Sequence, residues 1–182
     1  MAAPYFTIAP RQYVLCQNEV NMKLYLHQVV QGPNQNQVAV VPSSQPAGFG
    51  TIAVNDWTVI DGPNPSANIV ARAKGMHIQA DQANVGWYTS LLIIFEDGRF
   101  KGSSLQALAI TASAGELAII GGTGEFKMAR GTIKYKTVLN TPNIESIREL
   151  NIQAFYTPET PPTSKETKSL ETSATVNIPN VF

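Results

Sequence analysis

The sequence predicts an all-β domain, an antiparallel β-barrel of about eight strands. Stretches of strand length alternate with clusters of Gly, Pro, Asn and Asp that form turns. These stretches are rich in Val, Ile, Thr and aromatic residues, which suit the pleated surface of a sheet. No long segment combines a helical spacing of apolar residues with capping signals. Many short strands in one domain indicate a sandwich or a barrel, and a closed barrel leaves no exposed edge.

The predicted strands follow one another along the chain. They span residues 23–30, 37–41, 50–60, 69–79, 87–95, 100–109, 116–120, 129–139 and 146–156. In the first, Leu24 and Leu26 share one face while Tyr25 and His27 share the other. In the last, one face combines Ile144, Ser146, Arg148, Leu150, Ile152, Ala154 and Tyr156. Asp97-Gly98 supplies two positive-φ positions between apolar flanks, so we expect a type I′ hairpin there.

The 182 residues suffice for one domain with tails. We expect an N-terminal arm over residues 1–20, the barrel over 21–157, and a Pro/Thr/Ser-rich linker or tail over 158–182. Thirteen Lys and Arg balance thirteen Asp and Glu, so nucleic acid and membrane are not expected as partners. The single cysteine, Cys16, and the lack of a signal peptide pattern and of an N-glycosylation site favour a cytoplasmic location.

The chemical motifs exclude several classes of site. Residues 121–131, GGTGEFKMARG, match neither a dinucleotide-binding nor a phosphate-binding loop, so we expect a glycine turn that joins two strands. Two histidines without a companion cysteine make a weak metal site, and no GxSxG motif is present. We therefore expect no metal and no cofactor. Charged residues in apolar strands are open to two interpretations, surface ion pairs or catalytic groups; these are Asp56, Arg72, Glu125 and Arg130.

Five blocks of sequence resemble plant dirigent proteins. In chain order they are LYLHQVVQGPNQNQV, FGTIAVND, DGPNPSANIVARAKGMH, LLIIFEDGRFKGSSLQALA and IIGGTGEFKMARG, and the resemblance runs from Met22 to about Tyr156. It implies an eight-stranded antiparallel β-barrel, like that of allene oxide cyclase, with a pocket at one mouth, commonly in a homotrimer. Dirigent proteins steer the stereochemistry of phenoxy-radical coupling, as in lignan formation. A separate laccase or peroxidase supplies the oxidation, because the barrel has no redox centre.

The resemblance also implies site residues. A carboxyl group can protonate a quinone methide while an arginine orients it, and these catalytic roles fall on Asp56, Glu125 and Arg130. The candidate ligand-binding residues are Tyr25, His27, His77, Trp87 and Phe95. The chain departs from the family pattern in three places, with Asn55 in place of the first acid of a pair, Glu125 in place of Asp, and Lys127 in place of Arg.

Two functions remain open on this basis. The absence of secretion signals and the Pro/Thr/Ser-rich tail resemble the dirigent half of cytosolic grass proteins in which a jacalin-related lectin domain follows, which are stress and defence proteins. The first function is binding of a small phenylpropanoid phenol in the barrel, with enzymatic coupling undecided. The alternative is a non-catalytic interaction module that recruits a partner such as β-glucosidase. Asp56 and Arg130 in one apolar cavity favour the first, whereas outward pairing favours the second. A lipid-epoxide cyclase is suggested by fold analogy alone.

Overall fold

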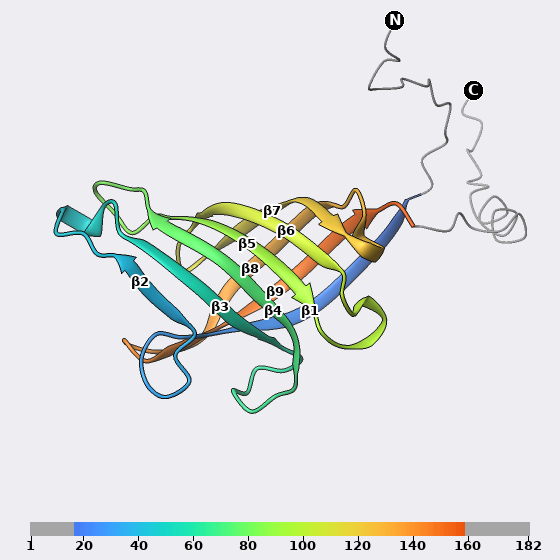
Figure 1. Ribbon diagram of the computed structural model, residues 1–182, viewed down its shortest axis with the longest axis horizontal. Helices are drawn as coiled ribbons and strands as arrows, with labels where there is room; N and C mark the ends of the chain where they lie inside the picture. The colour runs from blue at the N-terminus through green and yellow to red at the C-terminus, as the bar shows by residue number, and fades with distance from the viewer. Residues whose placement is uncertain (1–16, 159–182) are drawn as a thin grey trace, which may run out of the picture. The chain divides into compact units, whose positions relative to one another are not determined.

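Nine antiparallel strands form the domain in the computed structural model, which describes residues 17–158 (Figure 1). They are β1 (Asn18–Val29), β2 (Gln37–Val41), β3 (Ile52–Ile60), β4 (Ile69–Gln79), β5 (Trp87–Phe95), β6 (Ser104–Thr111), β7 (Ala114–Thr123), β8 (Arg130–Thr141) and β9 (Glu145–Tyr156). The sheet order is β1-β9-β8-β7-β6-β5-β4-β3, and pairing of β1 with β3 closes it into an eight-stranded barrel. The predicted fold class is confirmed, and the additional strand is β2.

The extra strand β2 lies where β1 and β3 separate. Tyr25 to His27 of β1 pair with Thr58 to Ile60 of β3. The earlier part of β3 pairs with β2 instead, from Gln37 opposite Asn55 to Val41 opposite Ile52. Strand β2 therefore covers the edge of β3 at one end of the barrel.

The interior follows from the alternation of the strands. Leu26 is buried inside and Tyr25 and His27 face outward, which confirms the predicted division of these residues between two faces of the strand. Along β9 the inward series Leu150, Ile152, Ala154 and Tyr156 is also confirmed. Because one face of each strand is buried, a shift of one residue in register would expose these side chains.

Aromatic side chains close one end of the barrel. The Phe126 ring centroid lies 5.2 Å from that of Phe95, 4.6 Å from that of Phe100 and 5.4 Å from that of Tyr156. Phe126 sits in the short 3-10 turn η3 (Gly124–Phe126) and is fully buried. The ends of β5 and β9 and the start of β8 lie at this closed end, so the open mouth is at the opposite end.

The glycine-rich segment has a packing role, and the expectation of a glycine turn between two strands is confirmed. It joins β7 to β8 and carries Phe126 into the barrel. A Cβ on Gly122 would collide with the carbonyl oxygen of Phe126 and lie 2.7 Å from that of Ser104. Gly124 has φ +60°, the left-handed region that favours glycine.

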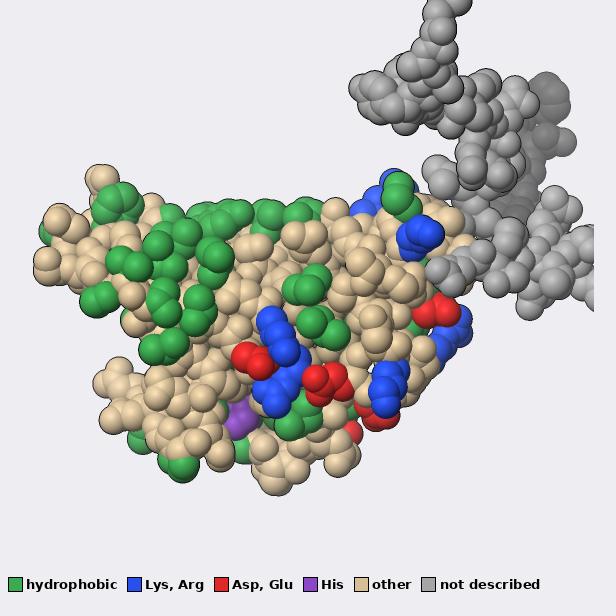
Figure 2. Space-filling view, in the orientation of Figure 1, with side chains coloured by type: hydrophobic (Ala, Val, Ile, Leu, Met, Phe, Trp, Pro, Cys, Tyr) green, Lys and Arg blue, Asp and Glu red, His purple; other side chains and the backbone are tan. Residues whose placement is uncertain are grey.

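A stripe of exposed apolar side chains crosses the outside of β2 to β6. We call Val38, Val54, Met76, Tyr88 and Ile110 the outer apolar stripe. Val38 is opposite Val54, Val54 is opposite Met76, and Tyr88 is opposite Ile110 in the strand registers. Figure 2 shows hydrophobic side chains gathered over the part of the barrel where Figure 1 places β2 to β5.

The turn between β5 and β6 differs from its prediction. The β5–β6 hairpin exists, but its turn is not type I′, because Asp97 is extended and a 3-10 turn, η2 (Gly98–Phe100), follows it. This longer turn allows Phe100 to pack on Phe95, whose ring centroid is 5.9 Å away.

The first strand begins at Asn18, inside the expected arm. The rest of that arm and the predicted tail beyond residue 158 lie outside the described residues. No helix in residues 17–158 has the length and hydropathy of a membrane span.

Candidate functional site

A cavity lies at the open mouth of the barrel. It has a volume of about 110 Å³ and is lined by Gln28, Gln37, Trp57, His77, Trp87, Thr89, Thr111 and Arg148. An apolar hollow of about 20 Å³ adjoins it and shares Trp57, Thr89, Thr111 and Arg148. Neither contains Asp or Glu among its lining residues. We call the two together the mouth cavity.

Three aromatic rings from neighbouring strands form one wall of the mouth cavity. The His77 ring of β4 stacks on Trp57 of β3 with centroids 5.1 Å apart. The Trp87 ring of β5 makes a T-shaped contact with His77, with centroids 5.0 Å apart. Strand β2 fixes this wall through Gln37, whose Oε1 accepts hydrogen bonds from Trp57 Nε1 at 3.0 Å and from Gln28 Nε2 at 2.6 Å. The wall is therefore held by the barrel and by the extra strand together.

His77 is neutral in this environment. Its side chain is buried, and burial lowers its pKa to about 4, with a further contribution from the positive charge of Arg148. Its Nδ1 is buried and has no hydrogen-bond partner among the described residues. The imidazole can therefore donate one hydrogen bond and accept another, according to its tautomer.

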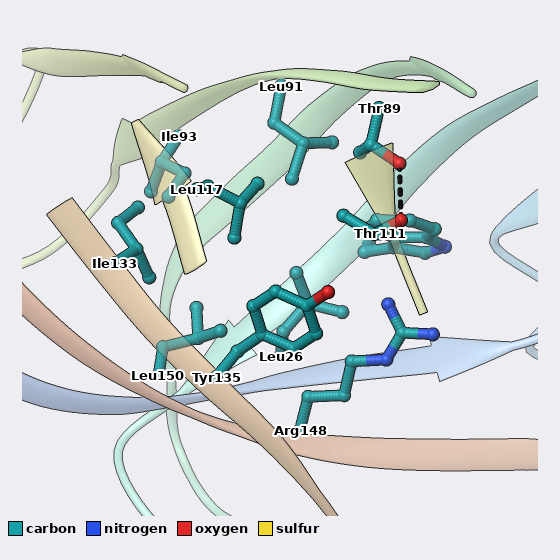
Figure 3. Close-up of a pocket in the computed structure, with 11 residues that line it drawn as sticks. Leu26, Thr89, Leu91, Ile93, Thr111, Leu117, Ile133, Tyr135, Arg148 and Leu150 are labelled. Atoms are coloured by element: carbon teal, nitrogen blue, oxygen red, sulfur yellow. Dashed lines mark hydrogen bonds between the residues drawn. The ribbon is translucent and has the colours of Figure 1, made fainter. Parts of the chain in front are cut away.

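The deep part of the mouth cavity is apolar. Figure 3 shows Leu26, Leu91, Leu117, Ile133 and Leu150 around it, with Tyr135 beside them. The hydroxyls of Thr89 and Thr111 form a hydrogen bond of 2.8 Å with each other, and the Tyr135 hydroxyl accepts one from the Ala112 amide at 3.1 Å. These polar groups are satisfied by the protein, so this region offers mainly apolar contact.

Arg148 brings a partly buried positive charge into the mouth cavity. It extends from β9 toward Thr111 and beside Tyr135, whose ring centroid lies 5.8 Å from Cζ (Figure 3). Its Nε is buried and has no hydrogen-bond partner in the described part of the chain. The nearby carboxylates pair elsewhere, Glu145 with His27 and Glu149 with Lys23 and Lys136. Burial lowers the pKa of Arg148, but an arginine side chain keeps its charge in proteins.

The predicted catalytic residue Asp56 does not face the mouth cavity. It lies on the outside of β3, where one carboxylate oxygen is 3.5 Å from Arg72 Nη1 and the other is 3.7 Å from Lys74 Nζ. Its neighbour Asn55 is the buried residue, because alternation along the strand turns only one of the two inward. The structure thus places an amide, not a carboxylate, inside.

Glu125 and Arg130 lie at the closed end, opposite the mouth. Glu125 is half-exposed and pairs with Arg99 at 3.7 Å, and Arg130 is exposed and donates to Gln17 Oε1 at 2.8 Å. Their segment turns Phe126 inward, which leaves these two charged neighbours outside. The structure therefore does not bring Asp56, Glu125 and Arg130 into one cavity.

The candidate ligand-binding residues separate into two groups. His77 and Trp87 line the mouth cavity. Phe95 belongs to the aromatic cluster of the closed end, and Tyr25 and His27 face outward from β1, with His27 Nε2 2.7 Å from Glu145 Oε2. These last three do not line the mouth cavity, because strand parity or position along the barrel directs them elsewhere.

The mouth cavity is also lined by three residues that were not predicted as site residues, Arg148, Trp57 and Gln37. The signal for Arg148 was present, since it shares the inward face of β9 with Leu150 and Ile152. A cation on an otherwise apolar strand face is costly unless it has a role. Gln37 had no such signal, because its place depends on how β2 joins the barrel. Within residues 17–158, no three His, Cys, Asp or Glu side chains cluster as metal ligands would.

Comparison with curated proteins finds relatives with two kinds of name. Pterocarpan synthase 1 of Glycyrrhiza echinata is 33% identical over 93 residues, which are 49% of this chain and 50% of that protein. Dirigent protein 21 of Arabidopsis thaliana is 35% identical over 89 residues, or 47% of each chain. The chain thus spans about half the length of the curated relatives it matches.

The solved structures and the family model extend the match over the whole barrel. The pterocarpan synthase dirigent protein GePTS1 has a TM-score of 0.74 and 30% sequence identity, covering 86% of this chain and 99% of its own. The related PsPTS1 has a TM-score of 0.71 and 26% identity, covering 79% and 97%. The model of the dirigent-like protein family matches residues 19–155, from the first strand to the last. The chain therefore belongs to the dirigent-like protein family.

Proposed function

We propose that the mouth cavity binds a small, flat phenolic ligand of the phenylpropanoid class and orients it for stereoselective coupling. The observation that carries this proposal is the wall formed by Trp57, His77 and Trp87, beside polar groups that have no partner within residues 17–158. Pockets for small molecules combine such apolar or aromatic walls with a few convergent polar groups. A flat ring can lie against this wall, and the apolar side chains of the floor can contact the part of the ligand that points inward.

The contribution of the protein is orientation. The residues that line the mouth cavity include no carboxylic acid, and the neutral His77 is a weak proton donor near neutral pH. Protonation of a quinone methide by Asp56 or Glu125 is therefore not part of the proposal. Holding two reactants in one geometry supplies several kcal/mol of catalysis without a catalytic acid. The oxidation comes from a separate laccase or peroxidase.

The names of the relatives support a role in the synthesis of small molecules. Two solved structures with the same fold are named pterocarpan synthases, and others of similar sequence are named dirigent proteins. These names connect barrels of this family with the synthesis of small molecules. For this chain the ligand and the reaction remain part of the proposal.

The proposal is tested by coupling in the presence of the purified chain. Coniferyl alcohol and ferulate are each oxidised by a non-selective one-electron oxidant, and the enantiomeric excess of the products is measured by chiral chromatography. We expect an excess with at least one substrate, reduced by more than half in Trp87→Ala and retained in Arg130→Ala, which changes the closed end. Racemic products from both substrates with folded protein would contradict the orienting role.

The second candidate function is an interaction module of a stress or defence protein, and the outer surface favours it. Asp56 and Arg130 pair outward, and the outer apolar stripe leaves five apolar side chains exposed across four strand pairs. Exposed apolar patches commonly mark protein contacts. We propose that further copies of this chain cover the stripe in a homotrimer. A partner such as β-glucosidase is the alternative occupant.

A further inference from the structure

We propose that the ligand of the mouth cavity is an aromatic carboxylate, with its carboxylate bound by Arg148. This inference rests on the proposed function and specifies its ligand class. It starts from the one charged side chain among the residues that line the cavity. Its chemistry selects between the neutral and the acidic members of the phenylpropanoid class.

The charge of Arg148 is not balanced by a neighbouring carboxylate among the described residues. In the described part of the chain no carboxylate forms an ion pair with Arg148, and Glu145 and Glu149 on the same strand are engaged by His27, Lys23 and Lys136. Arg148 is partly buried, with its Nε removed from water, and a cation held there without a counterion is destabilising. A carboxylate in the mouth cavity would supply the missing charge, and the planar guanidinium suits it with two parallel hydrogen bonds.

The polar neighbours of Arg148 in the cavity carry no charge. The other polar side chains that line the cavity are Gln28, Gln37, His77, Thr89 and Thr111, all uncharged at neutral pH because the pKa of His77 is lowered to about 4. Thr89 and Thr111 bond to each other, and Gln28 bonds to Gln37. The guanidinium is thus the free charged donor of the cavity.

The positions of Arg148 and the aromatic wall define the shape of the ligand. Arg148, Trp57 and His77 line the same cavity, so the charged donor and the stacked rings face one volume. A ligand that joins an aromatic ring to a carboxylate through a short linker satisfies both. Hydroxycinnamates have this form, whereas the corresponding alcohols carry no charge for Arg148.

The test compares ferulate with coniferyl alcohol, which differ in the acid and alcohol groups at the end of the same chain. Binding is measured by calorimetry. We expect ferulate to bind at least about tenfold more tightly than coniferyl alcohol, because hydrogen bonds between charged groups are stronger than those between neutral groups. The 4-O-methyl ether of ferulate, 3,4-dimethoxycinnamate, keeps the carboxylate and loses the phenol. It should retain this advantage, which excludes a phenolate as the source of the charge.

Variants assign the preference to Arg148. Arg148→Gln should remove the advantage of ferulate, Arg148→Lys should keep part of it, and Arg130→Gln, a matched change at the closed end, should leave it intact. Equal binding of the acid and the alcohol to the unaltered protein overturns this inference but leaves the proposed function standing. Failure of both ligands to bind overturns the proposed function as well. The comparison on the unaltered protein decides the matter even if a variant does not fold.

Discussion

At the residue scale, Arg148 gives the mouth cavity its positive charge and also lowers the stability of the folded protein. Its side chain is partly buried, its Nε is removed from water, and the described residues provide neither a hydrogen bond to Nε nor a carboxylate partner. A residue kept only for packing would not carry an uncompensated charge into an apolar barrel. We therefore interpret Arg148 as a binding residue whose cost is offset when a ligand is present.

This interpretation predicts that replacing the Arg148 side chain by an apolar one does not lower the stability of the fold. Arg148→Leu should leave the free energy of unfolding unchanged or raise it by about 1 kcal/mol, because a well-packed apolar side chain often replaces a buried charge without loss. Leu150→Ala, two residues further on the same inward face, should instead lose about 2–5 kcal/mol. Urea unfolding of both variants measures this. A loss in Arg148→Leu as large as that in Leu150→Ala would indicate a structural role.

His77 makes the stability of the barrel depend on pH. Its pKa is lowered from 6.5 to about 4 in the folded protein, so between these values the unfolded chain binds more protons than the folded one. Stability should therefore fall as the pH falls from 6.5 to about 4, by up to about 3 kcal/mol. His77→Gln should lose this part of the pH dependence. His27→Gln, the same change at the other histidine of the chain, should keep it, and equal profiles for the two variants would count against a buried neutral His77.

At the element scale, the strands and the glycine turn could be predicted from the sequence, whereas the form of the turn after Asp97 and much of the mouth could not. Alternation assigned Leu26 and Leu150 to definite strand faces, because period two is a local property of the chain, and the structure shows both faces to be inward. The turn after Asp97 differs from its local signal because Phe100 packs on Phe95 and Phe126. Asp56 and Arg130 were expected in a cavity, but strand parity and position along the barrel put them outside. Arg148 and Gln37 meet at the mouth through pairings between distant strands, which no local pattern reports.

The glycine-rich segment yields a prediction for the closed end. Gly122→Ala should lower the free energy of unfolding by about 1–3 kcal/mol, because its Cβ would collide with the carbonyl oxygen of Phe126, beside that of Ser104. Gly121→Ala is the matched control, since its Cβ would meet only Gln106 Oε1 at 3.8 Å. Thermal and urea unfolding compare the two. Similar losses in both variants would show that the close approach at Gly122 is not what the segment requires.

At the scale of the whole molecule, the outer apolar stripe and the mouth cavity separate assembly from ligand binding. We predict that Met76→Glu, in the middle of the stripe, shifts the proposed trimer to monomers. Val138→Glu is the matched control, because Val138 is similarly exposed, at 43% against 46%, and lies on β8 across the barrel from β4. Light scattering after size-exclusion chromatography reports the mass. A monomeric unaltered protein, or a trimer that Met76→Glu leaves intact, would contradict the assignment of the stripe.

The central claim is that the mouth cavity between Trp57, His77 and Trp87 is where the ligand binds, and the two tryptophans of the chain allow a direct test. Both indoles line this cavity, and Trp57 Nε1 donates to Gln37. A nitrogen-15 NMR titration with ferulate and with coniferyl alcohol follows the two indole N–H signals. We predict that both signals shift with the same saturation curve that calorimetry gives. Calorimetric binding that moves neither indole signal would place the ligand outside the mouth cavity and contradict the account.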